Sequence, residues 1–413
     1  MNTDLASTHA AQQRAPQPTI AVLGLGYVGL PVATAFAEKG FSVLGIDIDE
    51  QRLRELSEGR VQGPSAFVLS SALRDGRLTL AAEAAVLSRA DVVFICVPTP
   101  MEDGEARHEA VRACAASFAR HGRRDALVIL ESTVRPGFVT ELRPLLGHGG
   151  QVALAYAPER IDPQRSQAGM PLSAIPRLVA GVDDAARDQA ALLLWRIGVT
   201  VHPVSLAVAE LAKLLENSYR LVNVALADQF AALCRAEGVD VGEVIAAAST
   251  KPFGFQPFYP GVGAGGHCIV VDPGFLVQRG REVSVPLSLV EDALASNTQR
   301  PCSVAGTVAA HTSSQDTILV IGLTYKPGIA DTRQSAALTA VRTLAGMNRS
   351  VMVFDALVSA PDDLDGVSLG DGLAQASAVL LLVRQPDAVM AALATSGLPV
   401  FDATGTLAAA VAV

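Results

Sequence analysis

The amino-acid sequence predicts an α/β protein made of two doubly wound domains that are joined by a helical middle. Two strand–helix–strand units, one near the start of the chain and one beginning at Thr317, predict the two domains. Residues 205–236 carry apolar side chains at helical spacing without a glycine or proline, and they predict the helical middle. The length of 413 residues also exceeds what a single hydrophobic core covers.

The first strand–helix–strand unit opens with a buried strand at residues 19–23, followed by a glycine turn and a helix at residues 28–39. Gly40 ends this helix, and residues 42–46 form the next strand, which leads into Asp47. Such a unit requires parallel strands and a right-handed crossover. Further apolar runs extend the predicted sheet to about residue 203, and they lie at residues 91–97, 127–130 and 152–155.

The helical middle is long for a globular helix and apolar over a wide arc. Such a helix typically spans between domains or forms a subunit interface, so we expect a homodimer through it. The second domain is predicted from strands at 317–323, 350–356, 376–383 and 399–405 and a helix at 335–345. We therefore expect a flexible polar tail at 1–18, Rossmann-like domains at 19–203 and 306–413, and a central helical domain at 204–305.

The composition bounds the class of protein. Half of the residues are hydrophobic and 18% are charged, which is typical of a compact globular chain. No apolar run approaches the roughly 20 residues of a membrane helix, and the start does not resemble a signal peptide. The net charge of −9 argues against a broad nucleic-acid surface. Five scattered cysteines predict neither disulfides nor a metal site and favour the cytoplasm.

The first glycine turn has the pattern GxGxxG between a strand and a helix. Gly24 permits the tight turn, Gly26 lets the backbone approach a pyrophosphate, and Gly29 lets the helix pack on the strand. Asp47, at the end of the second strand, can accept hydrogen bonds from both ribose hydroxyls and would repel a 2′-phosphate. The turn therefore predicts an NAD site rather than an NADP site, against the alternative of a purely structural glycine turn.

A second signal lies in residues 263–273, where Cys268 follows a glycine-rich loop and a helix is expected to start near Asp272 and Pro273. Substrate can reach such a cysteine, and loop N–H groups would favour its thiolate as a nucleophile. Two alternatives stay open on local sequence: Cys268 is a small packing residue, or Asp272 merely caps the helix. His267 is adjacent to Cys268, but neighbouring side chains normally point apart.

A third signal is the stretch at residues 210–217, in which Lys213 and Asn217 share one helix face. A lysine among apolar neighbours can act as a base or stabilise a negative charge. Local sequence alone favours a solvated Lys/Glu surface instead. Polar loops at residues 97–100, 131–137 and 157–160 follow strands of the first sheet, where ligands bind, although turn chemistry explains them nearly as well. The remaining histidines are expected to be solvated or to cap helices.

Taken together and in their order along the chain, these motifs resemble those of the UDP-glucose/GDP-mannose dehydrogenase family. The matching segments are GLGYVGLP (24–31), Asp47, VPTP (97–100), ESTVRPG (131–137), PER (158–160), ELAKLLEN (210–217), PFYPGVGAGGHCIVVDP (257–273) and GLTYKPGIADTRQS (322–335). Together they cover nearly the whole chain except the N-terminal tail, and the set is far more specific than any one motif.

The resemblance implies a homodimer in which an NAD domain and a UDP domain flank a helical core, with the active site in the cleft between them. It implies a four-electron oxidation of a primary alcohol at C6 of a nucleotide sugar by two NAD. Cys268 would capture the aldehyde as a thiohemiacetal, a second hydride transfer would give a thioester, and water would release the acid. The partner is thus a UDP-sugar or dTDP-sugar.

The resemblance also implies roles for individual residues. Lys213 would help to deprotonate the alcohol, Asn217 would hydrogen-bond to its oxygen, and Glu159 would activate the hydrolytic water, with Asp272 and Thr133 holding a second water or base. The expected cofactor-binding residues are Gly24, Gly26, Tyr27, Val28, Gly29, Asp47, Pro98, Thr99, Ser132 and Thr133. The expected substrate-binding residues are Glu159, Arg160, Lys213, Asn217, Phe258, Tyr259, Gly263, Gly265, Gly266, Lys326 and Arg333.

Within the family, the motifs look more like the branch that acts on UDP-N-acetylhexosamines. The sequence departs from that branch at Gln164–Arg165, at Val270, at DTRQSAA (331–337) and at FDATG (401–405). A UDP- or dTDP-glucose dehydrogenase is therefore the alternative. Two other classes remain open: a two-electron hydroxy-acid dehydrogenase, which would not need Cys268, and a non-catalytic sensor of nucleotide sugars.

Overall fold

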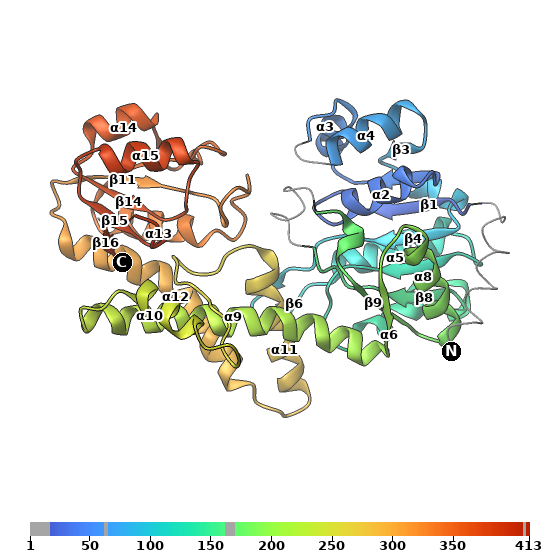
Figure 1. Ribbon diagram of the computed structural model, residues 1–413. Helices are drawn as coiled ribbons and strands as arrows, with labels where there is room; N and C mark the ends of the chain where they lie inside the picture. The colour runs from blue at the N-terminus through green and yellow to red at the C-terminus, as the bar shows by residue number, and fades with distance from the viewer. Residues whose placement is uncertain (1–16, 62–64, 162–169, 408–409) are drawn as a thin grey trace. The chain divides into compact units, whose positions relative to one another are not determined.

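The computed structural model describes residues 17–61, 65–161, 170–407 and 410–413, so the tail expected at residues 1–18 lies almost wholly outside it (Figure 1). The chain forms two compact units. The first holds residues up to Lys213 apart from a three-residue segment, Asp103–Glu105, and the second holds that segment and Leu214–Val413. The division therefore falls inside the long helix α9 (Leu206–Ala236).

The first unit is built on one eight-stranded sheet with the order β10-β9-β8-β7-β4-β1-β2-β3. Its strands are β1 (Ile20–Leu23), β2 (Val43–Ile46), β3 (Leu78–Ala81), β4 (Val92–Ile95), β7 (Leu127–Leu130), β8 (Ala153–Tyr156), β9 (Arg177–Gly181) and β10 (Val201–Pro203). The strand order reverses direction between β1 and β4. In a doubly wound sheet, ligands bind beyond the carboxyl ends of the strands at such a point.

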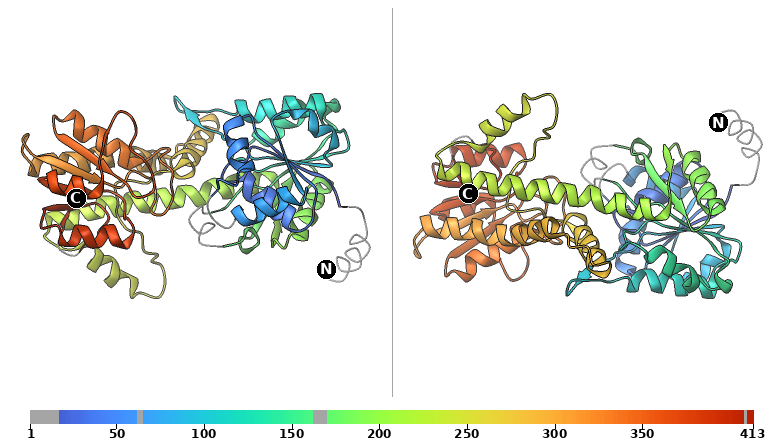
Figure 2. Two further views of the ribbon diagram at one scale, coloured as in Figure 1. Left: turned by 90° about the horizontal axis from the view of Figure 1, so that it is seen from above. Right: turned by 90° about the horizontal axis from the view of Figure 1, so that it is seen from below.

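Helices cover both faces of this sheet (Figure 2). Alternate residues of β1 point to opposite faces, so Ile20 and Val22 join one core cluster and Ala21 and Leu23 join the other. The first cluster includes residues of α2 (Gly29–Glu38), α4 (Ser65–Arg74) and α8 (Asp184–Arg196), and the second includes residues of α5 (Glu109–His121) and α6 (Phe138–Leu142). The remaining short elements are α3 (Glu50–Ser57), the hairpin of β5 (Met101–Glu102) and β6 (Glu105–Ala106), and the 3-10 turns Ala84–Arg89, Arg143–Leu146, His148–Gly150 and Leu172–Ala174.

One edge of the first sheet differs from the parallel arrangement that the sequence predicts. Strand β9 runs antiparallel to β8, and β10 pairs in parallel with β9. A parallel neighbour needs a long crossover connection, usually a helix, whereas the described part of the link from β8 to β9 contains only a 3-10 turn. The expected fold class is nevertheless confirmed, because the other strand pairs of this sheet are parallel.

The second unit carries a six-stranded parallel sheet with the order β13-β12-β11-β14-β15-β16. Its strands are β11 (Thr317–Ile321), β12 (Ser350–Phe354), β13 (Asp365–Gly366), β14 (Ala378–Leu381), β15 (Val400–Asp402) and β16 (Val411–Ala412). Helix α13 (Ala336–Gly346) packs with part of α12 (Ser288–His311) on one face, and α14 (Leu369–Gln375) and α15 (Asp387–Thr395) cover the other. This is the second Rossmann-like domain that the sequence predicts.

The helical part of the chain consists of α9, α10 (Val241–Ser249), α11 (His267–Glu282) and α12. Helix α9 begins and ends within one residue of the segment predicted from its apolar spacing. Among the described residues, no helix is long and apolar enough to span a membrane.

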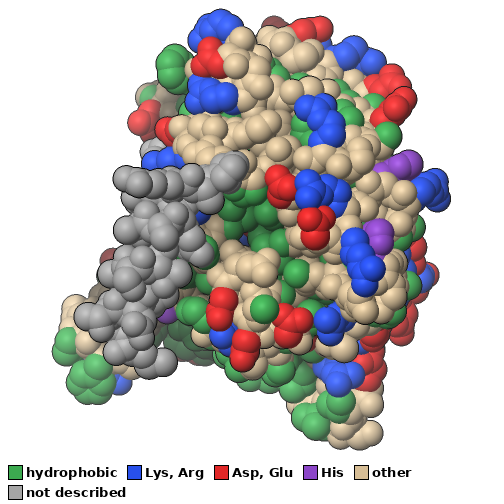
Figure 3. All heavy atoms as spheres, turned by 90° about the vertical axis from the view of Figure 1, so that its right-hand side faces the viewer, with side chains coloured by type: hydrophobic (Ala, Val, Ile, Leu, Met, Phe, Trp, Pro, Cys, Tyr) green, Lys and Arg blue, Asp and Glu red, His purple; other side chains and the backbone are tan. Residues whose placement is uncertain are grey.

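Basic and acidic side chains are interspersed on the face drawn in Figure 3. Exposed ion pairs of the first unit include Arg123–Asp91 at 2.9 Å and Arg187–Asp184 at 2.6 Å. Pairs of this kind stabilise a fold only weakly, because water screens them. The stability of the fold therefore depends on the apolar clusters that lie on both faces of each sheet.

Candidate functional site

The GxGxxG turn lies between β1 and α2, next to the end of β4. Gly24 has φ +89°, and a Cβ there would lie 2.8 Å from the carbonyl oxygen of Cys96. A Cβ on Gly29 would overlap the carbonyl oxygen of Gly24. A Cβ on Gly26, by contrast, would meet no protein atom within 4 Å. Packing within the protein therefore requires Gly24 and Gly29 but leaves Gly26 to be explained by a ligand.

Asp47 closes the same turn from the end of β2. One carboxylate oxygen accepts the N–H of Leu25 at 2.7 Å, and the other accepts the N–H of Asp49 at 3.0 Å. These bonds hold the carboxylate beside the turn while leaving lone pairs for ribose hydroxyls. The residues present thus fit an adenine dinucleotide that lacks a 2′-phosphate.

The second unit repeats this local geometry without the glycine pattern. Gly322, after β11, has φ +95°, and a Cβ there would lie 2.6 Å from the N of Val383. Asp355, after β12, accepts the N–H of Leu323 at 2.8 Å, as Asp47 accepts that of Leu25. Its carboxylate is buried and also receives the amide of Gln385 at 3.3 Å. This likeness was missed from the sequence, because it lies in the backbone geometry and not in the spacing of the glycines.

The two polar loops after β4 and β7 are joined by hydroxyl groups. Thr99 donates to the carbonyl oxygen of Thr133 at 2.6 Å, and Ser132 donates to that of Val97 at 2.7 Å. Thr99 and Ser132 are buried, whereas Pro98 is exposed and Thr133 is half-buried. The structure thus brings the expected cofactor residues of both loops together and gives two of their hydroxyls a bond within the protein.

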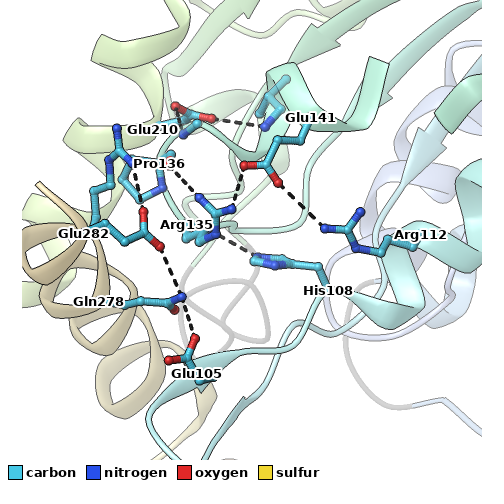
Figure 4. A network of polar contacts seen from close by, with 12 residues as sticks. Glu105, His108, Arg112, Arg135, Pro136, Glu141, Glu210, Gln278 and Glu282 are labelled. Atoms are coloured by element: carbon cyan, nitrogen blue, oxygen red, sulfur yellow. Dashed lines mark hydrogen bonds and ion pairs between the residues drawn. The ribbon is translucent and has the colours of Figure 1, made fainter. Parts of the chain in front are cut away.

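Glu210 holds the loop after β7 from the start of α9 (Figure 4). Its carboxylate accepts the N–H of Gly137 at 2.8 Å and the N–H of Val139 at 3.3 Å, at the first turn of α6. A carboxylate at this place satisfies N–H groups that have no partner within the helix. Only 4% of Glu210 is exposed, so the interpretation of residues 210–217 as a solvated Lys/Glu surface is wrong.

His108 supports the same loop from the residue before α5. Its ring stacks on Phe138, and its Nε2 accepts the N–H of Arg135 at 3.4 Å. Arg135 in turn donates to Glu141 at 2.6 Å (Figure 4). Burial, and then the charges of Arg135 and Arg112, lower the pKa of His108 to about 4, so the ring is neutral and can accept at neutral pH. His108 is buried, and although it stands at the N-cap position of α5 its side chain makes no capping hydrogen bond, so the expectation of a solvated or capping histidine is wrong for it.

Glu159, the residue expected to activate water, is 7% exposed and held at both of its oxygens. One oxygen accepts the N–H groups of Arg160, at 2.6 Å, and Ile161. The other accepts from Nη1 of Arg177 at 2.8 Å. Arg177 is fully buried and was not predicted from the sequence, because an arginine in a strand gives no sign of its partners. Gln164–Arg165, where the sequence departs from the UDP-N-acetylhexosamine branch, lie outside the described residues.

A hydrogen bond joins two elements that carry expected catalytic residues. Asn217 of α9 donates from its side-chain nitrogen to the carboxylate of Asp272 in α11 at 2.5 Å. Lys213 lies four residues before Asn217, and Cys268 lies four residues before Asp272, so each pair shares one face of its helix. Lys213 is 6% exposed and Asp272 is 1% exposed. The burial of Lys213 also excludes the solvated-surface interpretation.

The start of α11 corrects the expectation that a helix begins at Asp272. The helix begins at His267 with Gly266 at the N-cap, and Pro273 lies inside it. Gly266 has φ +80°, which lets the chain enter the helix directly from the glycine loop. Cys268 is therefore an exposed residue of the first turn, where free N–H groups favour a thiolate. Asp272 is bonded to Asn217 and is no cap, and the side chain of His267 lies outside the described residues.

Three buried polar residues hold the glycine loop that precedes Cys268. Asp228 accepts the N–H of Gly261 at 2.8 Å, and Arg300 donates to the carbonyl of Gly261 at 2.8 Å. Asn297 accepts from the N–H of Ala264 at 2.7 Å and donates to its carbonyl at 2.9 Å. All three residues were missed from the sequence. The polar pair Asn297 and Arg300, three apart on a helix, was the available signal.

The same loop contacts the turn that follows β11. The N–H of Gly266 donates to the carbonyl of Gln334 at 3.3 Å, and a Cβ on Gly265 would lie 2.9 Å from that oxygen. Gln334 has φ +52°, which is uncommon for a residue other than glycine. Arg333 of this turn is paired with Asp331 at 2.8 Å. The segments that contain Gly263, Gly265, Gly266, Lys326 and Arg333 thus meet within the second unit, whereas Tyr259 is exposed.

A dinucleotide turn at the switch point of one doubly wound sheet, followed by a second such sheet, is typical of nucleotide-dependent dehydrogenases. Comparison with protein families narrows this class. Three sequence profiles of the UDP-glucose/GDP-mannose dehydrogenase family match the chain: the NAD binding domain at residues 18–197, the central domain at 207–299 and the UDP binding domain at 319–406. The chain belongs to this family, and NAD is its cofactor.

Relatives of known name agree with this family. The UDP-N-acetyl-D-mannosamine dehydrogenase of Pyrococcus horikoshii is 32% identical over 385 residues, which cover 89% of this chain and 90% of that protein. The enzyme of the same name from Escherichia coli is 32% identical over 400 residues, which cover 88% and 93%.

Solved structures resemble the fold over nearly the whole chain. The UDP-D-ManNAc dehydrogenase structure from Pyrococcus horikoshii is 31% identical, with a TM-score of 0.85 and coverage of 94% of this chain and 95% of that one. The UDP-N-acetyl-mannosamine dehydrogenase of Staphylococcus aureus is 27% identical, with a TM-score of 0.79 and coverage of 95% and 96%. A UDP-glucose dehydrogenase from Pyrobaculum islandicum, 24% identical with a TM-score of 0.85 and coverage of 95% of both chains, shares the fold.

The glycine turn yields a first prediction. Gly26→Ala is expected to fold normally, because its methyl group meets no protein atom, and to raise the Kd for NAD about tenfold or more by keeping the phosphates away. Calorimetric titration with NAD measures this. Gly29→Ala is the matched control, since its methyl group overlaps the turn and should lower the free energy of unfolding by about 1–3 kcal/mol. Unchanged NAD affinity in Gly26→Ala would contradict the assignment.

The loop before Cys268 yields a second prediction. Asn297→Ala leaves the buried N–H and carbonyl of Ala264 without their partner, and it is expected to lower the free energy of unfolding by about 1–3 kcal/mol. Urea unfolding measures the loss. The exposed neighbour Gln299→Ala should stay within about 0.5 kcal/mol of the parent protein. Equal losses in both variants would show that the bonds of Asn297 do not hold the loop.

Proposed function

We propose that this protein oxidises the C6 primary alcohol of a UDP-N-acetylhexosamine to the carboxylate with two NAD, and that Cys268 is the covalent nucleophile. The observation that carries the proposal is the Asn217–Asp272 hydrogen bond. It links the helix face of Lys213 and Asn217 to the helix face of Cys268 and Asp272. Family membership supplies the reaction class, and this geometry supports the covalent route.

The proposed chemistry begins at the alcohol oxygen of C6. Lys213 takes up the proton of the alcohol as a hydride leaves C6, and Asn217 donates a hydrogen bond to the oxygen. The thiolate of Cys268 then adds to the aldehyde carbon and forms a C–S bond. A second hydride leaves the resulting thiohemiacetal and gives a thioester. Because the carbon stays bound to sulfur between the two oxidations, the aldehyde does not escape.

Hydrolysis completes the proposed cycle. Glu159 accepts a proton from water as its oxygen attacks the thioester, the C–S bond breaks, and the acid and the Cys268 thiolate are released. Asp272 and Thr133 are proposed to hold the second water or base. NAD, when bound, would supply the acceptor for both hydrides, so each sugar nucleotide would yield two NADH, with water as the source of the second carboxylate oxygen. A thiol nucleophile must be reduced, and we therefore expect the enzyme to act in the cytoplasm.

Binding of the substrate is proposed to use the second unit. The segments around Lys326 and Arg333 and the loop with Gly263, Gly265 and Gly266 are in contact within it. Cations and backbone N–H groups of this kind suit a diphosphate. Phe258 and Tyr259 belong to the same proposed surface, and Arg160 to the sugar end beside Glu159. We propose Tyr27, Val28 and Pro98 as further contacts of NAD.

UDP-N-acetyl-D-mannosamine is the first substrate to test. The Pyrococcus and Escherichia relatives carry that sugar in their names, and each is similar to this chain over most of its length. UDP-glucose or dTDP-glucose is the second candidate, favoured by the departures at Val270 and Gln334. Gln334 is the more telling of the two, because its carbonyl holds Gly266 and its backbone is left-handed.

A homodimer through α9 and α10 is part of the proposal. Leu226, Phe230 and Leu233 of α9 are each more than 40% exposed and recur every three or four residues. The first two line an apolar cavity of about 300 Å³ together with Val244 and Ile245 of α10. An apolar stripe of this width on a surface helix is typical of a subunit interface.

The reaction yields a third prediction. With excess NAD, one of UDP-N-acetylmannosamine, UDP-N-acetylglucosamine, UDP-N-acetylgalactosamine, UDP-glucose and dTDP-glucose should give two NADH per molecule consumed, measured by absorbance and chromatography. One NADH per molecule would mean that the aldehyde is the product. Binding of a sugar nucleotide with no NADH from any of them would favour a sensor.

Cys268→Ser separates the covalent route from a two-electron dehydrogenase in the same assay. The variant should lose activity by about a thousandfold or more, because a serine oxygen is a poor nucleophile without a strong base. Its Kd for NAD should not change. Cys302→Ser is the matched control, since Cys302 lies in α12 and contacts Thr343. Full activity of Cys268→Ser would exclude the thiohemiacetal.

The proposed interface yields a fourth prediction. The parent protein should sediment as a dimer, and Leu226→Glu should sediment as a monomer, because a charge in an apolar interface has no partner. Ala232→Glu places the same charge on an exposed position of the same helix and should remain dimeric. A monomeric parent protein, or a dimer that persists in Leu226→Glu, would place the interface elsewhere.

A further inference from the structure

Three charged side chains are buried together beyond the carboxyl ends of β7 and β8 in the first unit. Arg177, the first residue of β9, is 0% exposed, Glu131 is 1% exposed and Glu159 is 7% exposed. Nη1 of Arg177 lies 2.8 Å from Glu159, and Nη2 lies 2.9 Å from Glu131. The proposed chemistry uses Glu159 but neither of the other two residues.

The two carboxylates differ in the hydrogen bonds that they accept. Glu159 accepts from Arg177 and from the N–H groups of Arg160 and Ile161. Neither oxygen of Glu131 has a hydrogen-bond partner among the described residues. Nη2 of Arg177, its ion-pair neighbour, donates instead to the carbonyl of Ala157 at 2.7 Å. The carboxylate of Glu159 therefore has three hydrogen-bond donors, whereas the charged contact of Glu131 among the described residues is its ion pair with Arg177.

The charges of the cluster do not balance if both carboxyls are ionised. One guanidinium would then face two carboxylates, and a net negative charge would remain buried, which is strongly unfavourable. One bound proton removes this charge. It belongs on the carboxyl whose charged form has the fewest donors, which is Glu131.

We propose that these residues act as one unit, in which Arg177 positions the carboxylate of Glu159 and Glu131 carries the proton that balances the charge. This inference rests on the proposed function, because that function gives Glu159 its part in hydrolysis. Loss of the proton from Glu131 leaves Glu159 beside a second negative charge. Glu159 then becomes a stronger proton acceptor, so the rate of hydrolysis rises with pH.

The electrostatics of the cluster agree with this geometry. Burial raises the pKa of Glu131 to about 7 against the opposing charge of Arg177, and Glu159 adds to the rise. Cys96, after β4, is a further titratable group near the cluster. Burial, with the charges of Glu131 and Glu159, raises the pKa of Cys96 well above its ordinary value, so it stays a neutral thiol. The change near neutral pH thus belongs to Glu131.

The proton can be tested on the purified protein without substrate, which is the fifth prediction. Infrared spectra should show the carbonyl stretch of a protonated carboxyl at pH 6 that fades by pH 8. This component should be absent from Glu131→Gln and unchanged in the exposed control Glu83→Gln. Burial also raises the pKa of Asp228, to about 6, so the band of Glu131 is the part of the parent spectrum that Glu131→Gln lacks. Carboxyl bands that fade identically in the parent protein and in Glu131→Gln would overturn the proposal.

Kinetics test the coupling to Glu159. The ratio of kcat in the parent protein to kcat in Glu131→Gln should rise about three- to tenfold between pH 6 and pH 8, since the ratio cancels pH effects common to both. Glu83→Gln should show a constant ratio. A constant ratio for Glu131→Gln as well would overturn the coupling, because a purely structural loss is the same at both pH values.

Arg177→Lys tests the positioning. It keeps the charge but not the fork that reaches Glu159, Glu131 and Ala157 together, so kcat should fall about tenfold or more while KM for NAD stays near its parent value. Parent values of both constants would overturn the role of Arg177. Turnover of no sugar nucleotide by the parent protein would refute the proposed function alone, and the infrared titration would still show whether Glu131 carries a proton.

Discussion

The hydrogen bond between Asn217 and Asp272 is the contact on which the proposed catalytic arrangement depends. Neither residue is proposed to form a covalent bond with the substrate. Their bond joins α9 to α11, and Cys268 lies four residues before Asp272 on the same face of α11. The glycine loop before Cys268 is fixed by Asp228, Asn297 and Arg300, so polar contacts lie on both sides of the proposed nucleophile.

A common constraint explains why polar side chains are buried beneath the loops that follow β4 and β7 in the first unit. Loops at the carboxyl ends of strands have to expose backbone groups to a ligand, so they cannot satisfy all of their N–H and carbonyl groups with one another. Glu210, Thr99 and Ser132 supply the missing partners from elsewhere in the chain. Each of these bonds spans more than 30 residues of sequence. The loops are thereby held in place before a ligand binds, which lowers the entropy that binding would otherwise cost.

The same constraint explains which features of the fold and the site could be predicted from the sequence. The βαβ units, the long helix α9 and the glycine turn were predictable, because spacing along the chain determines them. The start of α11 was placed wrongly at Asp272, because Asp followed by Pro favours a helix start. The helix begins after Gly266, whose positive φ and close approach to the ring of Tyr325 cannot be read from the sequence. Asn297 was missed although its spacing from Arg300 on one helix was a signal. Arg177 was missed because its partners lie in other elements, and a contact of that kind leaves no periodic trace in a sequence.

The buried carboxylate of Asp355 distinguishes the second Rossmann-like domain from the first. Asp47 and Asp355 each accept a backbone N–H group of their turn, and Asp355 also accepts a hydrogen bond from the side chain of Gln385. The carboxylate of Asp47 can therefore accept hydrogen bonds from a ribose in addition to those from its turn. The carboxylate of Asp355 already has the amide of Gln385 as a further donor. We therefore expect the coenzyme in the first of the two Rossmann-like domains, and inhibitors that resemble adenosine should discriminate between them.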